Sequence, residues 1–146
     1  MNFNKILLFT TVIILISINN TNAQETCNLK VIVNGLKNSQ GQIMISINQG
    51  AVGWPEENFY EQRFIAEFNA PTHIIYFENL PYGNYAIGLL HDENVNGEMN
   101  KNFIGIPKEG FAFSRNYKVM FRAPKYEEAN FEVNASKKTI IIHMQY

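Results

Sequence analysis

Oxygen-bearing side chains occupy alternate positions in one glycine-containing segment of the chain. Asp92, Asn94 and Asn96 alternate with other residues, Gly97 follows, and Asn100 adds another amide. Proteins bind calcium with several carboxylate, amide and carbonyl oxygens that a curled chain aims at one point. The pattern therefore predicts a calcium site in this segment.

The spacing matches only the first half of an EF-hand loop. Counted from Asp92, oxygen donors fall at positions one, three, five and nine, and a glycine falls at position six, as in that motif. Position twelve should be a bidentate glutamate and is Phe103. A looser, weak calcium loop is one interpretation, with ligands from Asp92, Asn94, Asn96, the carbonyl of Glu98, and Asn100. The alternative is that these side chains cap turns by bonding to their own backbone.

The same segment continues into a stretch with many large apolar side chains, which a solvated linker would not usually hold. We therefore predict an ordered loop over residues 91–114 and interpret it as the functional surface. Exposed aromatic rings beside polar groups are typical of ligand sites, so exposure of Trp54, Phe111 or Phe113 would favour this interpretation. The candidate ligand-binding residues are His91, Glu109, Phe111, Phe113 and Ser114.

No residue set amounts to a catalytic signature. His91, Asp92 and Ser114 have the composition of a hydrolytic triad, but neighbours on a strand point to opposite faces, which opposes the required His–Asp hydrogen bond. Glu93 and Glu109 have the composition of an acid/base pair, but loop carboxylates are usually solvated. We therefore predict that the protein is not an enzyme, and a hydrolase that uses the loop carboxylates is the least favoured alternative.

Residues 1–23 have the features of a signal peptide. One charge, Lys5, precedes an apolar run at residues 6–18, and Thr21-Asn22-Ala23 places small residues where a signal peptidase reads. We predict cleavage after Ala23 and an exported, periplasmic or extracellular domain over residues 24–146. Because the apolar run is shorter than the roughly 20 residues that span a bilayer, we expect no transmembrane anchor in the mature chain.

The mature chain has the size of one domain and no basic character. Loss of Lys5 leaves 11 basic residues against 13 acidic ones, a net charge of −2. The basic residues are scattered, which argues against a nucleic-acid partner, because phosphate binding needs clustered Lys and Arg. Cys27 is the only cysteine, so we expect no internal disulfide and a frayed thiol. Polar residues precede it where a lipobox needs apolar and small ones, so we expect no lipid anchor.

Alternating apolar residues predict strands along the mature chain. Runs at residues 29–33 and 43–47 are interpreted as a hairpin. Residues 85–92 are apolar on both faces, which is typical of a central strand. A helix over residues 56–68 competes with a strand at residues 63–69. Further strands are predicted at residues 73–78, 129–133 and 140–144. About seven short strands with intervening turns predict an antiparallel, immunoglobulin-like β-sandwich with a long ordered loop after its central strand.

A tyrosine opens the predicted central strand after a glycine turn. The segment Leu80–Tyr85 resembles the tyrosine corner of immunoglobulin-like sandwiches, in which the tyrosine hydroxyl bonds to the backbone upstream. We therefore expect Tyr85 to have a structural role.

Longer motifs resemble a known family. The segment Gly83–Ser114, the Val-x-Val-x-Gly-Leu-x-Asn pattern at Val31–Asn38, and Glu-Glu-Ala-x-Phe at Glu127–Phe131 resemble the bacterial family called domain of unknown function 2141. The resemblance implies an exported, sandwich-like domain with no assigned activity. It also implies a looser similarity to transthyretin-like and carboxypeptidase-regulatory sandwiches, which are mostly accessory, structural or binding modules. The family's usual aspartate is Asn100 here, which removes a charge from any cation site.

Taken together, the sequence favours a binding or accessory module whose 91–114 loop contacts an envelope or extracellular ligand, such as a carbohydrate, a peptide or a protein. The alternative is a purely structural envelope module whose loop is a set of capped turns.

Overall fold

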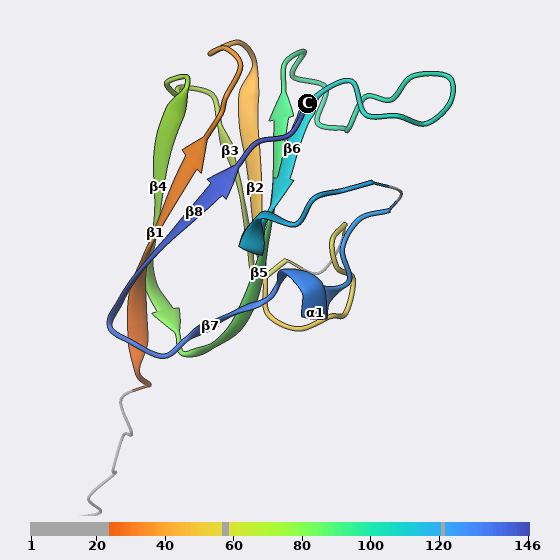
Figure 1. Cartoon of the computed structure of the whole chain (residues 1–146). Helices are drawn as coiled ribbons and strands as arrows, with labels where there is room; N and C mark the ends of the chain where they lie inside the picture. Colours follow the sequence, from red (N-terminus) through yellow and green to blue (C-terminus); the bar gives the residue numbers. More distant parts are fainter. Residues whose placement is uncertain (1–23, 57–58, 121) are drawn as a thin grey trace, which may run out of the picture.

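The computed structural model describes residues 24–56, 59–120 and 122–146, so the predicted signal peptide lies outside the described residues. These residues form two facing β-sheets, which confirms the all-β sandwich (Figure 1). In chain order the elements are β1 (Thr26–Asn34), β2 (Gln42–Asn48), β3 (Glu61–Ile65), β4 (Thr72–Pro81), β5 (Gly83–Asp92), β6 (Gly110–Phe113), the 3₁₀ turn η1 (Ser114–Asn116), α1 (Tyr126–Ala129), β7 (Phe131–Val133) and β8 (Lys137–His143).

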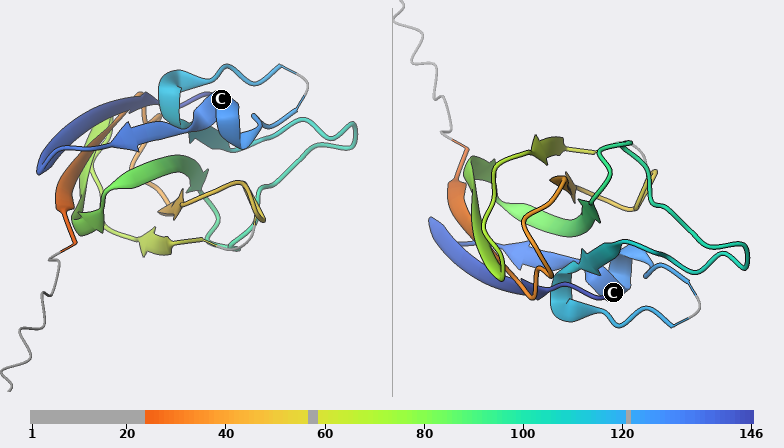
Figure 2. Two further views of the ribbon diagram at one scale, coloured as in Figure 1. Left: turned by 90° about the horizontal axis from the view of Figure 1, so that it is seen from below. Right: turned by 90° about the horizontal axis from the view of Figure 1, so that it is seen from above.

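The strands divide between a smaller and a larger sheet, which lie face to face (Figure 2). The smaller sheet has the order β4-β1-β8, and the larger has the order β3-β2-β5-β6, with β7 paired to the start of β5. Strands β1 and β8 run parallel. The other strand pairs of the described chain are antiparallel, so the antiparallel prediction is wrong for this one pair.

The predicted hairpin between the first two strands is wrong. Both runs are strands, but β1 pairs with β4 and β8, whereas β2 pairs with β3 and β5 in the opposite sheet. A period-two pattern shows that one face of a strand is buried and does not say which strand lies beside it. Residues 35–41 carry the chain from one sheet to the other, and Leu36 N–H donates to the carbonyl of Pro71 on the way (3.1 Å).

Three other local predictions differ from the structure. The competing helix over residues 56–68 is wrong for Glu61–Ile65, which is strand β3 paired to β2. The end of the predicted loop forms β6, a short strand on the open edge of β5. Cys27 is not frayed: it is fully buried in β1 opposite Leu80.

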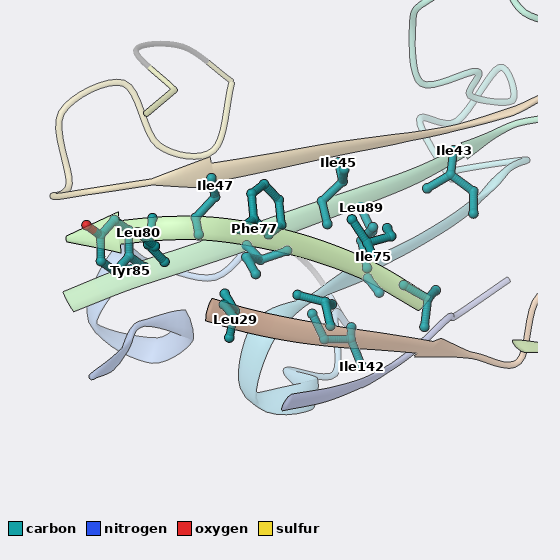
Figure 3. Packing of buried hydrophobic residues seen from close by; sticks show 14 of the residues in the cluster. Leu29, Ile43, Ile45, Ile47, Ile75, Phe77, Leu80, Tyr85, Leu89 and Ile142 are labelled. Atoms are coloured by element: carbon teal, nitrogen blue, oxygen red, sulfur yellow. The ribbon is translucent and has the colours of Figure 1, made fainter. Parts of the chain in front are cut away.

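The core fills the space between the two sheets with aliphatic and aromatic side chains (Figure 3). Alternate residues of each strand point inward, as the period of two requires. The largest fully buried apolar side chains are Tyr85, Phe77, Leu29, Ile43, Ile45, Ile47, Leu80, Ile87 and Ile142. The apolar alternation of the sequence therefore identified the core correctly.

Strand β5 is the central strand that the sequence predicted. It pairs with β2 along one side and with β6 and β7 along the other. Near its start, the Tyr85 hydroxyl donates to the carbonyl of Pro81 (2.8 Å), which confirms the tyrosine corner. Burial, with smaller effects from the neighbouring Tyr60 and Tyr126, raises the pKa of Tyr85 to about 12. At its other end β5 delivers His91 and Asp92 to the start of the loop.

Candidate functional site

The loop leaves β5 and returns on the adjacent strand β6, where His91 is paired with Gly110. It extends well beyond the end of the sandwich (Figures 1 and 2). We call residues 91–100 together with residues 109–110 the loop base, and residues 101–108 the loop tip. The two parts differ in the kind of side chain that they bury and expose.

Asp92 is a fully buried carboxylate that organises the first turn of the loop base. Its Oδ1 accepts from the backbone N–H of Asn96 (3.1 Å), and its Oδ2 accepts from Gly97 N–H and from Gln42 Nε2 (both 2.8 Å). Burial raises the pKa of the Asp92 carboxyl, but the hydrogen bonds from Gln42, Gly97, Asn96 and Val95 outweigh it and hold the pKa below its ordinary value. The carboxylate is thus ionised and solvated by the protein.

The other candidate metal ligands also bond within the loop base. Asn94 Oδ1 accepts from Asn96 N–H (3.2 Å), and Asn96 Oδ1 accepts from Glu98 N–H (3.0 Å). The side-chain nitrogen of Asn96 donates to the amide oxygen of Asn100 (3.0 Å). The alternative of capped turns accounts for the bonds from Asn94 and Asn96 to backbone N–H groups, and the calcium site stays a prediction.

Glu109 is the second buried carboxylate of the loop base. It joins the two arms of the loop, because Oε1 accepts from Glu93 N–H (3.1 Å) and Oε2 accepts from Asn100 N–H (2.9 Å). With its side-chain nitrogen turned toward the carboxylate, Asn100 also donates to both Glu109 oxygens (3.0 and 3.1 Å). This donor amide and the two backbone N–H groups stabilise the Glu109 carboxylate by hydrogen bonding.

His91 is fully buried, and both of its ring nitrogens have protein partners. Because the Gln40 carbonyl can only accept, Nε2 carries the proton and donates to it (2.8 Å). The Tyr146 hydroxyl donates to Nδ1 (2.7 Å) and accepts from Lys37 N–H (3.0 Å). The edges of Phe68 and Tyr146 pack against the ring. His91 therefore fastens three segments distant in sequence to one another.

Two glycines permit the close packing around these buried groups. A Cβ at Gly41 would overlap the carbonyl oxygen of Asp92 and lie 2.6 Å from the Cα of Glu93. A Cβ at Gly110 would overlap the Tyr146 ring. The segment before β2 and the end of the chain thus both press against the loop base.

The remaining candidate ligand-binding residues lie on β6 and at the start of η1. Ser114 is buried where β6 ends; its Oγ donates to the carbonyl of Ala129 (2.6 Å) and accepts from Ile87 N–H (2.9 Å). Phe113 packs edge-to-face with Trp54 (ring centroids 5.7 Å apart), and Phe111 packs beside it. All three rings are half-buried, so the exposed aromatic rings expected of a ligand surface are not found at these positions. His91 and Glu109 lie together at the loop base, but Ser114 does not join them.

The loop exposes four large apolar side chains: three belong to its tip, and the fourth, Val95, lies in the base and is 60% exposed. Phe103 is 98% exposed, Ile104 64% and Ile106 54%. The sequence marked these residues as signs of an ordered loop and did not place them in a site. A signal in the sequence does distinguish these residues. They form an apolar cluster between two lysines, and this cluster lacks the apolar–polar alternation of a strand.

The family comparison covers both parts of the loop. A family model described as "Uncharacterized protein conserved in bacteria (DUF2141)" matches residues 31–141. The chain belongs to this family. The match confirms the resemblance seen in the sequence and runs from β1 into β8. No curated protein and no solved structure matches the chain.

The hollows of this DUF2141 domain are open and shallow. A cleft of about 380 Å³ lies between the loop base and tip, lined by Glu93, Asn94, Asn100, Lys101, Lys108 and Glu109. A second hollow of about 480 Å³ lies beside Trp54 and α1. Within residues 24–56, 59–120 and 122–146, no three His, Cys, Asp or Glu side chains gather closely enough to hold a metal ion. Over the same described residues, no helix is long and apolar enough to cross a membrane.

Proposed function

We propose that this DUF2141 domain is an exported, non-enzymatic binding or accessory module that contacts its envelope or extracellular partner through the 91–114 loop. The observation that carries the proposal is the exposure of Phe103, Ile104 and Ile106 together at the loop tip. Neighbouring large apolar side chains in full contact with water mark interaction sites on soluble proteins. Single exposed apolar residues need no such explanation.

The construction of the loop base supports the same role. Asp92 and Glu109 accept hydrogen bonds from backbone N–H groups of the outgoing arm, at residues 93–100, and Glu109 thereby ties the returning arm to it. A tip held in one conformation loses little conformational entropy when it binds, which favours affinity. The base thus presents the tip as a preorganised contact.

The partners of the polar side chains favour binding over hydrolysis. A hydrolytic nucleophile needs a base within hydrogen-bond reach, but Ser114 Oγ is held by Ile87 and Ala129. Both ring nitrogens of His91 are engaged by Gln40 and Tyr146. The features of residues 1–23 support export, which also places the tip among envelope components.

A sedimentation assay tests the proposal. Purified protein is mixed with cell-envelope membranes of the bacterium that encodes it, and the retained fraction is compared between wild type and Phe103→Ser/Ile104→Ser. We expect the double variant to lose most retention, whereas Val52→Ser/Met120→Ser, which also removes two exposed apolar side chains, keeps it. Because all four side chains are exposed, unfolding free energies should stay within about 0.5 kcal/mol of wild type.

Equal retention of the tip variant and wild type would refute the loop as the contact. A wild type that is not retained at all would favour the purely structural alternative.

A further inference from the structure

We propose that the loop tip inserts into the interface of an anionic phospholipid bilayer. This inference rests on the proposed function, since it names the partner of the same loop. Three properties of the tip support it: its apolar side chains, its internally bonded backbone and its flanking charges.

The tip combines an aromatic and two branched aliphatic side chains at one protruding end. Phe103 is almost completely exposed, and Ile104 and Ile106 are more than half exposed beside it. Figure 2 shows the loop reaching away from both sheets, so a flat surface can meet the tip before it meets the sandwich. Segments that bind in the bilayer interface bury a small apolar surface of this kind just below the headgroups.

The backbone of the tip is bonded internally. Asn102 N–H donates to the Ile106 carbonyl (2.8 Å), and Gly105 N–H donates to the Asn102 carbonyl (2.9 Å). The Asn102 side-chain Oδ1 accepts from the N–H groups of both Ile104 (3.1 Å) and Ile106 (2.9 Å). An irregular segment enters a medium poor in water only when its polar backbone groups already have partners. A tip built for strand pairing with another protein would instead keep such groups free.

Two exposed lysines flank the apolar tip. Lys101 and Lys108 lie on opposite arms of the loop, where the backbone of Lys101 pairs with Pro107, and both are exposed and line the same cleft. Among the described residues, neither lysine has a carboxylate within 4.0 Å. No acidic residue lies between Met99 and Lys108. Lysines beside an inserted apolar segment place their ammonium groups at the headgroups and favour anionic lipids.

A vesicle flotation assay tests the inference with purified protein. Vesicles of phosphatidylglycerol and phosphatidylcholine are compared with vesicles of phosphatidylcholine alone. We expect binding to the anionic vesicles and a loss of roughly tenfold or more in apparent affinity for Phe103→Ser/Ile104→Ser, because two apolar side chains no longer leave water. Lys101→Gln and Lys108→Gln should each weaken binding to the anionic vesicles by about fivefold. Val52→Ser should bind as wild type does.

An environment-sensitive fluorophore measures insertion directly. The native Cys27 is fully buried, so a thiol-reactive dye attaches to a new cysteine at Phe103→Cys or, as a control, at Val52→Cys. We expect a blue shift on adding anionic vesicles for the dye at position 103 and none for the dye at position 52.

The outcomes separate this inference from the proposed function. Retention on envelope membranes that depends on the tip, without binding to anionic vesicles, would overturn the lipid inference and leave the binding module intact. The same holds if sedimentation shows a tip-dependent dimer in place of vesicle binding, since the occupant is then a second copy of the chain. If the tip substitutions affect neither retention nor vesicle binding, both proposals fail.

Discussion

The base and the tip of one loop invert the usual distribution of side chains. The base buries charged and polar groups, including Asp92 and Glu109, whereas the tip exposes Phe103 and Ile104 to water. A buried carboxylate is stable only when donors replace its lost hydration. Backbone N–H groups of the base supply most of them, and the side chain of Gln42 supplies another to Asp92. Nothing within the described chain covers the tip. The contrast teaches that the polar residues of the base bond to one another and hold its fold, whereas the exposed apolar residues of the tip are the ones that we propose contact a partner.

The largest effect should follow from breaking the packing behind the base. We expect Gly41→Ala to lower the free energy of unfolding by about 3 to 4 kcal/mol, because its φ is +74° and the new Cβ meets backbone atoms of Asp92 and Glu93. Gly97→Ala is the matched control. Its φ is +78° but nothing lies within 4 Å of the new Cβ, so the cost should be about 1 kcal/mol. Urea unfolding of both variants measures the difference, and equal costs would show that the segment before β2 does not press on the base.

The next effect comes from the buried charge of the base. Asp92→Asn should lower stability at neutral pH by about 2 kcal/mol, because hydrogen bonds to a carboxylate are stronger than those to an amide. The pKa of Asp92 is lower in the folded protein than its ordinary 3.8. The ionised Asp92 carboxylate therefore contributes fully to the free energy of unfolding above pH 3.8. This contribution is lost as the pH falls through the lower pKa of the folded protein.

Urea unfolding of wild type and Asp92→Asn across pH tests this sign. We expect the two stabilities to converge below about pH 4. Glu98→Gln, which removes an exposed carboxylate of the same base, should keep the stability of wild type near neutral pH. A stability gap for Asp92→Asn that stays constant down to the acid transition would contradict an ionised Asp92.

A moderate effect is expected at the opposite end of β5. Tyr85→Phe removes the hydrogen bond to the Pro81 carbonyl and should cost about 1 kcal/mol. Retention on envelope membranes should stay at the level of wild type, because the tip is unchanged. This variant separates lost stability from lost binding: a fall in retention equal to that of the tip variant would mean that retention reports stability alone.

The smallest effect should be that of calcium. A cation would need the side-chain oxygens of Asp92, Asn94 and Asn96. These oxygens already accept hydrogen bonds from backbone N–H groups. We therefore expect several millimolar calcium to leave the melting temperature almost unchanged. A rise of several degrees, absent in Asp92→Asn and weaker with magnesium, would establish the calcium site instead, since a ligand that binds only the folded state raises its stability.

Local patterns of the sequence predicted the sandwich and much of its detail. The alternation in β1, β2 and β5 identified the inward side chains, and the glycine before Tyr85 identified the corner. The partners of β1 and β2 were not predictable in this way, because alternation carries no information about which strands are neighbours. The parallel pairing of β1 with β8 joins the two ends of the domain, which no local pattern encodes.

The sequence predicted where the loop lies but not what its residues contact. The loop was located correctly, because oxygen-bearing side chains around a glycine require a curled chain. The roles of His91 and Glu109 depend on partners that are distant in sequence, such as Tyr146 for His91. From side-chain type alone, both residues were predicted to bind a ligand. The apolar character of Phe103 indicated only an ordered loop, and its position as the most exposed large apolar residue of the described chain depends on the shape of the folded loop.

The contrast between base and tip is tested most directly by photo-crosslinking with a diazirine amino acid, which reacts with lipid and protein alike. The probe is placed at position 103 in the tip or at position 94 in the base, both exposed, and the protein is irradiated with cell-envelope membranes. We predict strong adducts from position 103 and few from position 94. Equal labelling from both positions, or none from position 103, would contradict the assignment of contact to the tip and folding to the base.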